Sequence, residues 1–186
     1  MANFYGSLTG FGGGGAPSPF MEATGGTVTE VATNYKVHTF TSDGTFEVTK
    51  LGDTGIVDFL CVAGGGGGGY RNGGGGGAGG VILSFNGETS GGGDTGGATA
   101  LTLALDSYDI TVGCGGASTT VGFDSVIEGK ATAIGGGDGN GITNLAGGAG
   151  GSGGGGNGSG AGGVSTFTVN MGHDYDSKGG GGWGET

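Results

Sequence analysis

Apolar residues along the chain gather in short runs that are bounded by glycine or polar residues. The densest runs are 56–63, 81–85, 101–105 and 109–112, which are rich in valine, isoleucine, leucine and threonine. Short β-prone runs between turn residues are typical of buried strands. The pattern therefore predicts a mainly β or irregular fold with essentially no α-helix. Because run 56–63 is almost continuously apolar, we expect one strand that is covered on both faces.

A β-hairpin is predicted just before this strand. Residues 35–41 are β-prone, and the sequence Ser42-Asp43-Gly44 carries the Asp-Gly turn signal. Residues 45–48 then return with a second β-prone run. We expect His38 to lie on one face of this hairpin, because side chains alternate along a strand.

Long glycine runs interrupt the apolar pattern in two places. Residues 64–69 are all glycine, and a second run at 73–80 follows the triplet Tyr70-Arg71-Asn72. The same form recurs within 147–163, where a break at Asn157-Gly158 separates two glycine-rich runs. In both places a polar break suited to a turn lies between runs of similar length.

These runs predict layered polyglycine-II helices packed beside the strands as a glycine-rich sandwich. Such a helix is left-handed and extended, has three residues per turn and makes no internal hydrogen bonds. Glycine keeps its N–H group and has no Cβ, so neighbouring helices can approach closely and pair N–H with C=O laterally. That pairing would satisfy the buried backbone groups and offset the entropic cost of glycine.

Composition and charge narrow the class of protein. Glycine supplies 58 of the 186 residues, charged residues are 11%, and the formal net charge is −11. Glycine disfavours helices, and two prolines without a strict Gly-X-Y phase exclude collagen. The acidic charge argues against nucleic-acid binding, and no apolar stretch is long enough for membrane insertion. Disorder, the simplest reading of so much glycine, conflicts with the apolar runs.

The first 25 residues differ from the rest and predict a docking arm. The segment is too short and too interrupted to bury its own apolar residues, which are Phe4, Tyr5, Leu8, Phe11 and Phe20. We expect residues 1–25 to pack on another protein, because ordering such a segment requires contacts from elsewhere. The alternatives are an arm folded back on its own domain or a frayed terminus. Residues 26–186 would form the glycine-rich β/polyglycine-II domain.

The ordered succession of these features resembles the glycine-rich domain of bacteriophage tail fibres and adhesins. The residues that carry the resemblance lie within 26–182, in the order 37–46, 57–69, 73–81, 108–117 and 131–137. The resemblance implies a protein on the exterior of the virion, often at a fibre tip. It also implies layered polyglycine helices whose loops contact the host surface.

No motif in the sequence indicates catalysis, a cofactor or a metal. Run 64–69 matches G-x-G-x-x-G, but no helix pattern follows it. Gly129-Lys130 precedes Ala131 and not a serine or threonine, so the phosphate-binding loop pattern fails. The segment 173–176 is better explained as a solvated loop than as a cation site. We therefore expect no enzyme, no cofactor and no metal. Cys61 and Cys114 are expected to be small buried hydrophobic residues, although a disulfide stays open.

The candidate contact residues lie at the predicted turns between glycine runs. Tyr70, Arg71 and Asn72 form the most distinctive turn, and Arg71 is the only arginine in the chain. Tyrosine and arginine are enriched at binding hot spots, although a plain turn would explain the same triplet. Trp183, the only tryptophan, follows the last glycine run. It could contact a partner or cap the end of the glycine layers.

Together these features predict a non-enzymatic phage virion protein of a tail fibre or tail-associated appendage. The arm would bind other virion proteins, and the glycine-rich head would contact host polysaccharide or an outer-membrane protein, with the chain forming a homo-oligomer on the particle. The alternative is a capsid or tail decoration or connector protein with a structural role. Ice binding is a third possibility, but it would require ranks of threonine or alanine along one face, which the sequence does not contain.

Overall fold

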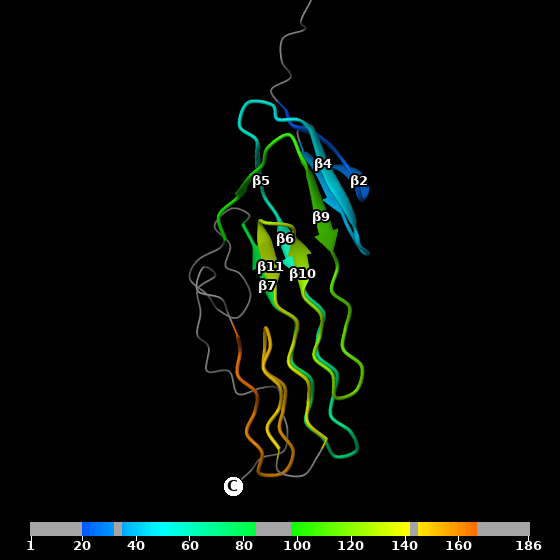
Figure 1. Ribbon diagram of the computed structural model, residues 1–186, viewed down its shortest axis with the longest axis vertical. Helices are drawn as coiled ribbons and strands as arrows, with labels where there is room; N and C mark the ends of the chain where they lie inside the picture. Colours follow the sequence, from blue (N-terminus) through cyan, green and yellow to red (C-terminus); the bar gives the residue numbers. More distant parts are fainter. Residues whose placement is uncertain (1–19, 32–34, 85–97, 142–144, 167–186) are drawn as a thin grey trace, which may run out of the picture.

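The computed structural model describes residues 20–31, 35–84, 98–141 and 145–166. Figure 1 shows an elongated molecule with β-strands at one end and extended glycine-rich segments at the other. The described residues contain eleven strands and no helix. The mainly β prediction is therefore confirmed for this part of the chain. None of its elements is a helix that could span a lipid bilayer.

The largest sheet has five antiparallel strands drawn from the whole length of the fold. Its order is β1 (Glu22–Thr24), β4 (Gly44–Lys50), β9 (Ser107–Thr111), β10 (Ser125–Ile127) and β11 (Ala131–Ala133). Three antiparallel pairs accompany it: β2 (Thr27–Val31) with β3 (Tyr35–Thr39), β5 (Ile56–Val57) with β8 (Leu101–Thr102), and β6 (Leu60–Val62) with β7 (Val81–Leu83).

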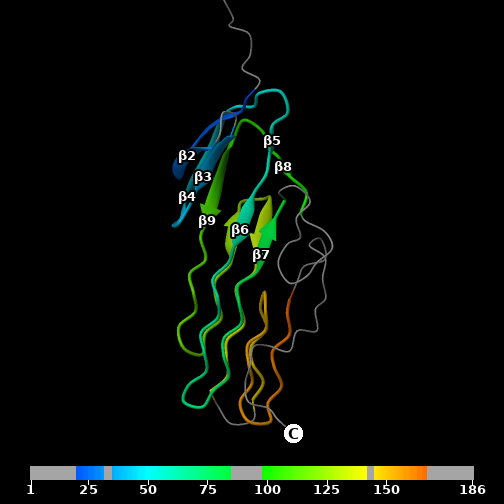
Figure 2. The ribbon, with the colours of Figure 1, turned by 180° about the vertical axis from the view of Figure 1, so that it is seen from behind.

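Two small apolar clusters hold these sheets together. One contains Val48, Leu103 and Tyr108, and the Ala104 N–H donates to the Tyr108 hydroxyl at 2.8 Å. The other contains Cys61, Ala63, Ile82 and Ala133, which lie where β6 and β7 pack against β10 and β11 (Figure 2). In the described part of the chain, the buried apolar clusters thus lie at the strand end of the molecule.

The predicted hairpin at 35–48 is wrong. β3 pairs with β2, whereas β4 pairs with β1 and β9. The turn residue Asp43 accepts a hydrogen bond from the Val112 N–H at 2.8 Å, so its carboxylate joins β4 to the distant β9 segment. The Phe40 ring lies against Gly44, where a built Cβ would come within 3.2 Å of it.

The single strand predicted at 56–63 is also wrong in its extent and burial. The segment divides into β5 and β6, which belong to different sheets. Cys61 points into the core with 7% exposure, but Leu60 and Val62 are 66% and 51% exposed. Only one face of β6 is therefore covered, because β10 and β11 pack against that face alone.

Beyond the strands, the glycine segments show a repeat of three residues. Along 74–80 the burial runs buried, exposed, half-buried and then repeats. The hydrogen bonds to the neighbouring segment follow the same spacing. Ala63 donates to Gly80 at 3.0 Å, Gly66 to Gly77 at 2.8 Å and Gly69 to Gly74 at 2.7 Å. A β-strand would repeat every two residues, so these segments are extended but are not paired as a sheet.

Segment 134–140 lies at the centre of this arrangement. Its backbone groups form hydrogen bonds with five other segments, which are 64–67, 74–80, 120–123 and, on the two sides of a bend at 151–152, 148–151 and 152–155. The bonds to 74–80 again recur every third residue, with Ile134, Gly137 and Asn140 as acceptors. A strand in a sheet has at most two hydrogen-bonded neighbours, whereas this segment is surrounded.

Glycine is required where these segments touch. A Cβ built at Gly136 would lie 2.1 Å from the Gly77 carbonyl oxygen, and one at Gly139 would lie 2.0 Å from that of Gly74. Positions that face outward are free of this constraint, since a Cβ at Gly68 would come no closer than 3.8 Å to its nearest neighbour.

We predict that Gly139→Ala lowers the free energy of unfolding by about 2 kcal/mol, because the new methyl group would force two segments apart. The matched control Gly68→Ala should leave stability unchanged or raise it by less than about 1 kcal/mol, since it restricts only the unfolded chain. Urea denaturation measures both. Equal effects of the two substitutions would contradict a close-packed glycine region.

The two cysteines differ, and the prediction that both are buried is wrong for one of them. Both thiols are free, Cys61 is buried and Cys114 is exposed. Burial raises the pKa of the Cys61 thiol, whose S–H donates to the Ser125 carbonyl at 3.4 Å.

We expect a thiol reagent at pH 8 to label Cys114 alone in the folded protein, because Cys61 is both inaccessible and protonated. The second thiol should react only after denaturation. Labelling of both cysteines at one rate, or of neither, would show that the cluster around Cys61 is not packed as described.

Candidate binding surface

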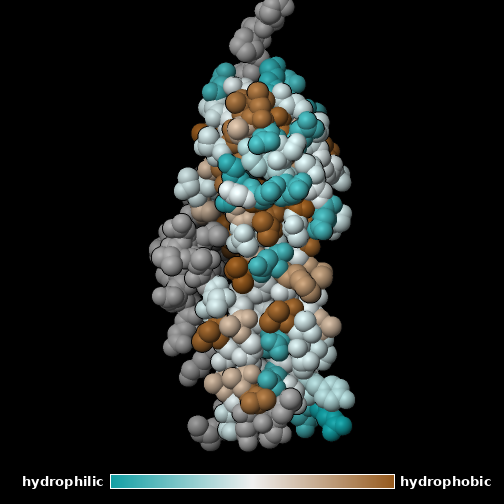
Figure 3. Space-filling view, in the orientation of Figure 1, coloured by the Kyte–Doolittle hydropathy of each residue, from teal (hydrophilic) through white to brown (hydrophobic). Residues whose placement is uncertain are grey.

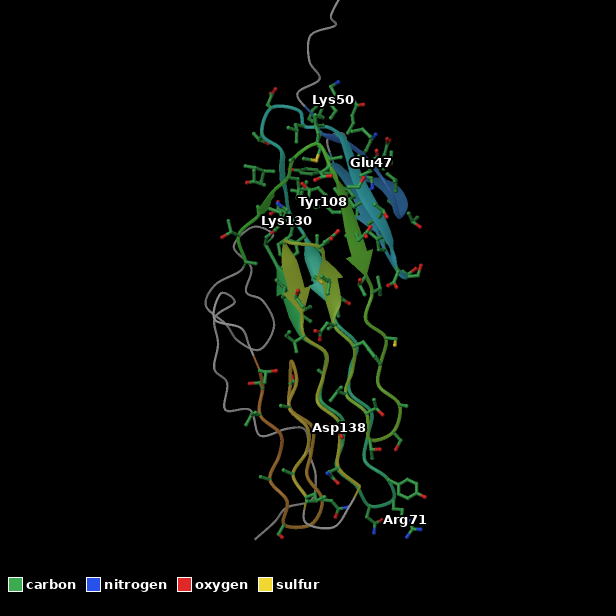
Figure 4. The ribbon with its side chains drawn as sticks, in the orientation of Figure 1. Glu47, Lys50, Arg71, Tyr108, Lys130 and Asp138 are labelled. Atoms are coloured by element: carbon green, nitrogen blue, oxygen red, sulfur yellow. The ribbon has the colours of Figure 1, made fainter. Side chains whose placement is uncertain are left out.

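The turn Tyr70-Arg71-Asn72 lies at the end of the molecule farthest from the strands. It joins segments 64–69 and 73–80, and the Gly69 N–H closes it by donating to Gly74 at 2.7 Å. Figure 4 shows Arg71 at this end, directed away from the glycine segments. Figure 3 shows a hydrophilic cluster at the same corner of the surface.

Tyr70 and Arg71 present a ring and a cation side by side. The Tyr70 side chain is 61% exposed, and the guanidinium carbon of Arg71 lies 5.5 Å from the centroid of its ring. The ion pairs found among the described residues are Lys36–Glu30 and Lys50–Glu22, so Arg71 has no carboxylate partner there. As far as residues 20–31, 35–84, 98–141 and 145–166 are concerned, its donors are therefore available to an external acceptor.

The backbone at Arg71 is strained. Its φ is +57°, and Thr119 has a φ of +56°. Every other described residue with a positive φ is glycine, namely Gly25, Gly26, Gly52, Gly55, Gly129 and Gly158. A side chain in this region costs about 1–2 kcal/mol for an ordinary residue, so each of these two residues lowers the stability of the fold.

Hydrogen bonds bring three turns together at this end. The Thr119 N–H and the Ser118 hydroxyl donate to the Gly68 carbonyl at 3.0 and 3.1 Å. The Asn157 amide donates to the Asn72 carbonyl at 3.1 Å, across 85 positions of sequence. We call Tyr70, Arg71, Asn72, Ser118, Thr119 and Asn157 the distal surface. From the sequence, only Tyr70, Arg71 and Asn72 were candidate contact residues. No local sequence pattern shows that the other two turns lie beside them.

Charge is distributed unevenly along the molecule. Arg71, Asp124 and Asp138 are the only charged residues in the described glycine-rich parts, 63–80, 113–124, 134–141 and 145–166. The described remainder, at the strand end, holds nine acidic residues and three lysines. The Asp124 carboxylate accepts the Gly135 N–H at 2.7 Å, and Asp138 lies further up the segments (Figure 4). Among the described residues, the distal surface is therefore locally cationic, although the protein as a whole is acidic.

A shallow hollow on the side of the molecule is a weaker candidate for a binding site than the distal surface. It has a volume of about 580 Å³, and its lining includes Asp43, Cys114, Phe123 and Asp124. Both carboxylates already accept backbone N–H groups, from Val112 and from Gly135. Within the described ranges no three His, Cys, Asp or Glu side chains gather as they would to hold a metal.

The remaining candidate residues lie largely outside the described part of the chain. These are Phe4, Tyr5, Leu8 and Phe11 of the predicted arm, and Trp183. Phe20, the last aromatic residue of the arm, is 55% exposed and lies just before β1. β1 itself pairs with β4 at the edge of the five-stranded sheet.

Comparison with protein-family models, with curated proteins and with solved structures gave no match to the chain. The account of its function below therefore depends on the geometry described here and on the sequence resemblance.

We predict that Arg71→Gly raises the free energy of unfolding by up to about 1 kcal/mol, because glycine adopts a positive φ without strain. Asn72→Gly is the matched control: with no positive φ to relieve, it should lower stability by roughly 0.5–1 kcal/mol through the entropy of the unfolded chain. Chemical denaturation measures both. Destabilisation of equal size in the two variants would refute the strain assigned to Arg71.

Proposed function

We propose that the chain is a non-enzymatic virion protein of a bacteriophage, belonging to a tail fibre or a tail-associated appendage. Residues 1–25 anchor it to the particle, and the glycine-rich head projects outward and contacts the host surface. The resemblance to glycine-rich fibre and adhesin domains supports this proposal, and so does the arrangement of the two ends of the molecule.

We further propose that the glycine segments are polyglycine-II helices layered as a sandwich beside the strands. Backbone hydrogen bonds that recur every third residue support this, since three residues make one turn of such a helix. The five hydrogen-bonded neighbours of segment 134–140 support it as well. A bundle of this kind resists bending, because each segment is held on several sides.

The functional proposal depends on one observation, namely that β1 and the distal surface lie at opposite ends of the molecule. The start of the described chain, at β1, lies at the strand end, whereas Arg71 and its turn lie at the glycine-rich end (Figures 1 and 4). A protein attached through its N-terminal segment would therefore hold its distal surface away from the particle. The glycine segments act as a stiff spacer between attachment and contact.

Competition for adsorption tests the proposal. The purified full chain should reduce phage adsorption to susceptible cells, because it occupies the surface sites that the particle uses. A chain lacking residues 1–19 should compete equally well but should be absent from particles assembled with it. The two results separate host contact, by the head, from anchoring, by the arm.

A decoration role would give the opposite pattern. The purified chain would then fail to compete, and particles without the protein would adsorb and infect normally. Normal incorporation of the truncated chain would refute the anchoring role of the arm.

A further inference from the structure

We propose that the distal surface binds a carboxylate-bearing saccharide, with Arg71 pairing with the carboxylate and Tyr70 stacking on the sugar ring. This inference rests on the proposed host-contact function and assigns a ligand chemistry to it. It depends on three observations: the strain at this end, the open cation and the exposed aromatic ring.

Strain is the first observation. The chain has 58 glycines and places glycine at the six other described positions where φ is positive, apart from Thr119. Arg71 and Thr119 lie at the same end of the molecule, and both of their turns are tied to segment 64–69. Strained non-glycine residues cluster at functional sites, where the side chain does something that folding does not require. The arginine side chain is thus present for what it contacts outside the fold.

The charge of the ligand follows from the guanidinium. Its planar fork of donors matches a carboxylate in a two-bond geometry, and no described carboxylate occupies it. The acidic residues of the strand end are separated from it by a run of seven residues, 63–69, which spans roughly 20 Å when extended. That exceeds the screening length of about 8 Å at physiological ionic strength. The acidic residues of the strand end therefore do not repel an anion at this end, and the described carboxylates outside the strand end are only Asp124 and Asp138.

The saccharide nature of the ligand follows from the groups around Arg71. Tyr70 is the only residue of the distal surface with a large apolar face, and it is 61% exposed. Asn72 belongs to the same turn as Tyr70, and Ser118 and Thr119 lie in the turn that is hydrogen-bonded to Gly68, two residues before Tyr70. A single ring among hydroxyls and amides fits a sugar, which offers C–H groups on one face and hydroxyls at its edge. A protein partner would require a larger apolar patch at the centre of the contact.

The experiment measures binding of the full chain to immobilised oligogalacturonate and sialyllactose, each beside its neutral methyl ester. Wild type should bind at least one acid and bind its ester at least tenfold more weakly. Arg71→Asn should weaken binding to the acid about tenfold and leave the ester unchanged. Asparagine tolerates a positive φ, so this variant keeps the turn and removes only the cation.

Three further variants complete the test. Tyr70→Leu should weaken binding to both the acid and its ester, because stacking does not depend on charge. Arg71→Lys should fall between wild type and Arg71→Asn, since it keeps the charge without the fork. Lys36→Gln, which removes an exposed cation at the strand end, should bind as wild type does. Failure of wild type to bind either acid, or an equal loss in Lys36→Gln, overturns the proposal.

Binding to susceptible cells distinguishes this inference from the function on which it rests. If Arg71→Asn binds cells as wild type does, host contact stands and the assigned ligand chemistry is wrong. If wild type itself does not bind cells, the proposed function fails whatever the saccharides show.

Discussion

Lateral hydrogen bonds between main-chain groups are the interaction on which the glycine-rich half of the molecule depends. Each contributes only about 1 kcal/mol net, but they run in several directions from every inner segment. They require backbones closer together than any Cβ would allow, as the carbonyl oxygens within 2.1 Å of the built Cβ positions at Gly136 and Gly139 show. The abundance of glycine is therefore a packing requirement and not a sign of flexibility.

The strands and the glycine segments form one continuous structure. β6 and β11 run directly into segments 63–69 and 134–140, and segment 73–80 leads into β7. Ser125 fixes the junction, because its buried hydroxyl donates to the Val62 carbonyl at 2.7 Å and accepts the Gly113 N–H at 2.9 Å. The apolar clusters at the strand end thus set the relative positions of segments that have almost no side chains with which to set their own.

The sequence predicted the class of fold and the places of the glycine runs, but not which strands pair. The Asp-Gly turn at 43–44 is a good local signal, yet Asp43 bonds to Val112 and the strands beside it separate. Local patterns carry no information on such long-range competition. The distal surface shows the same limit. Tyr70, Arg71 and Asn72 were visible as a turn, whereas Thr119 and Asn157 join them only through the side-by-side packing of segments far apart in sequence.

The outward-facing positions of the glycine segments have a consequence for how this surface can vary. Gly65 and Gly68, three residues apart, have room for a Cβ, and Ala78 already carries one at an exposed position. Side chains placed at this interval would project from one face at steps of roughly 9 Å without disturbing the bonded interior. Single substitutions at these outward-facing positions could therefore change the binding properties of the face while the hydrogen-bonded interior stays the same.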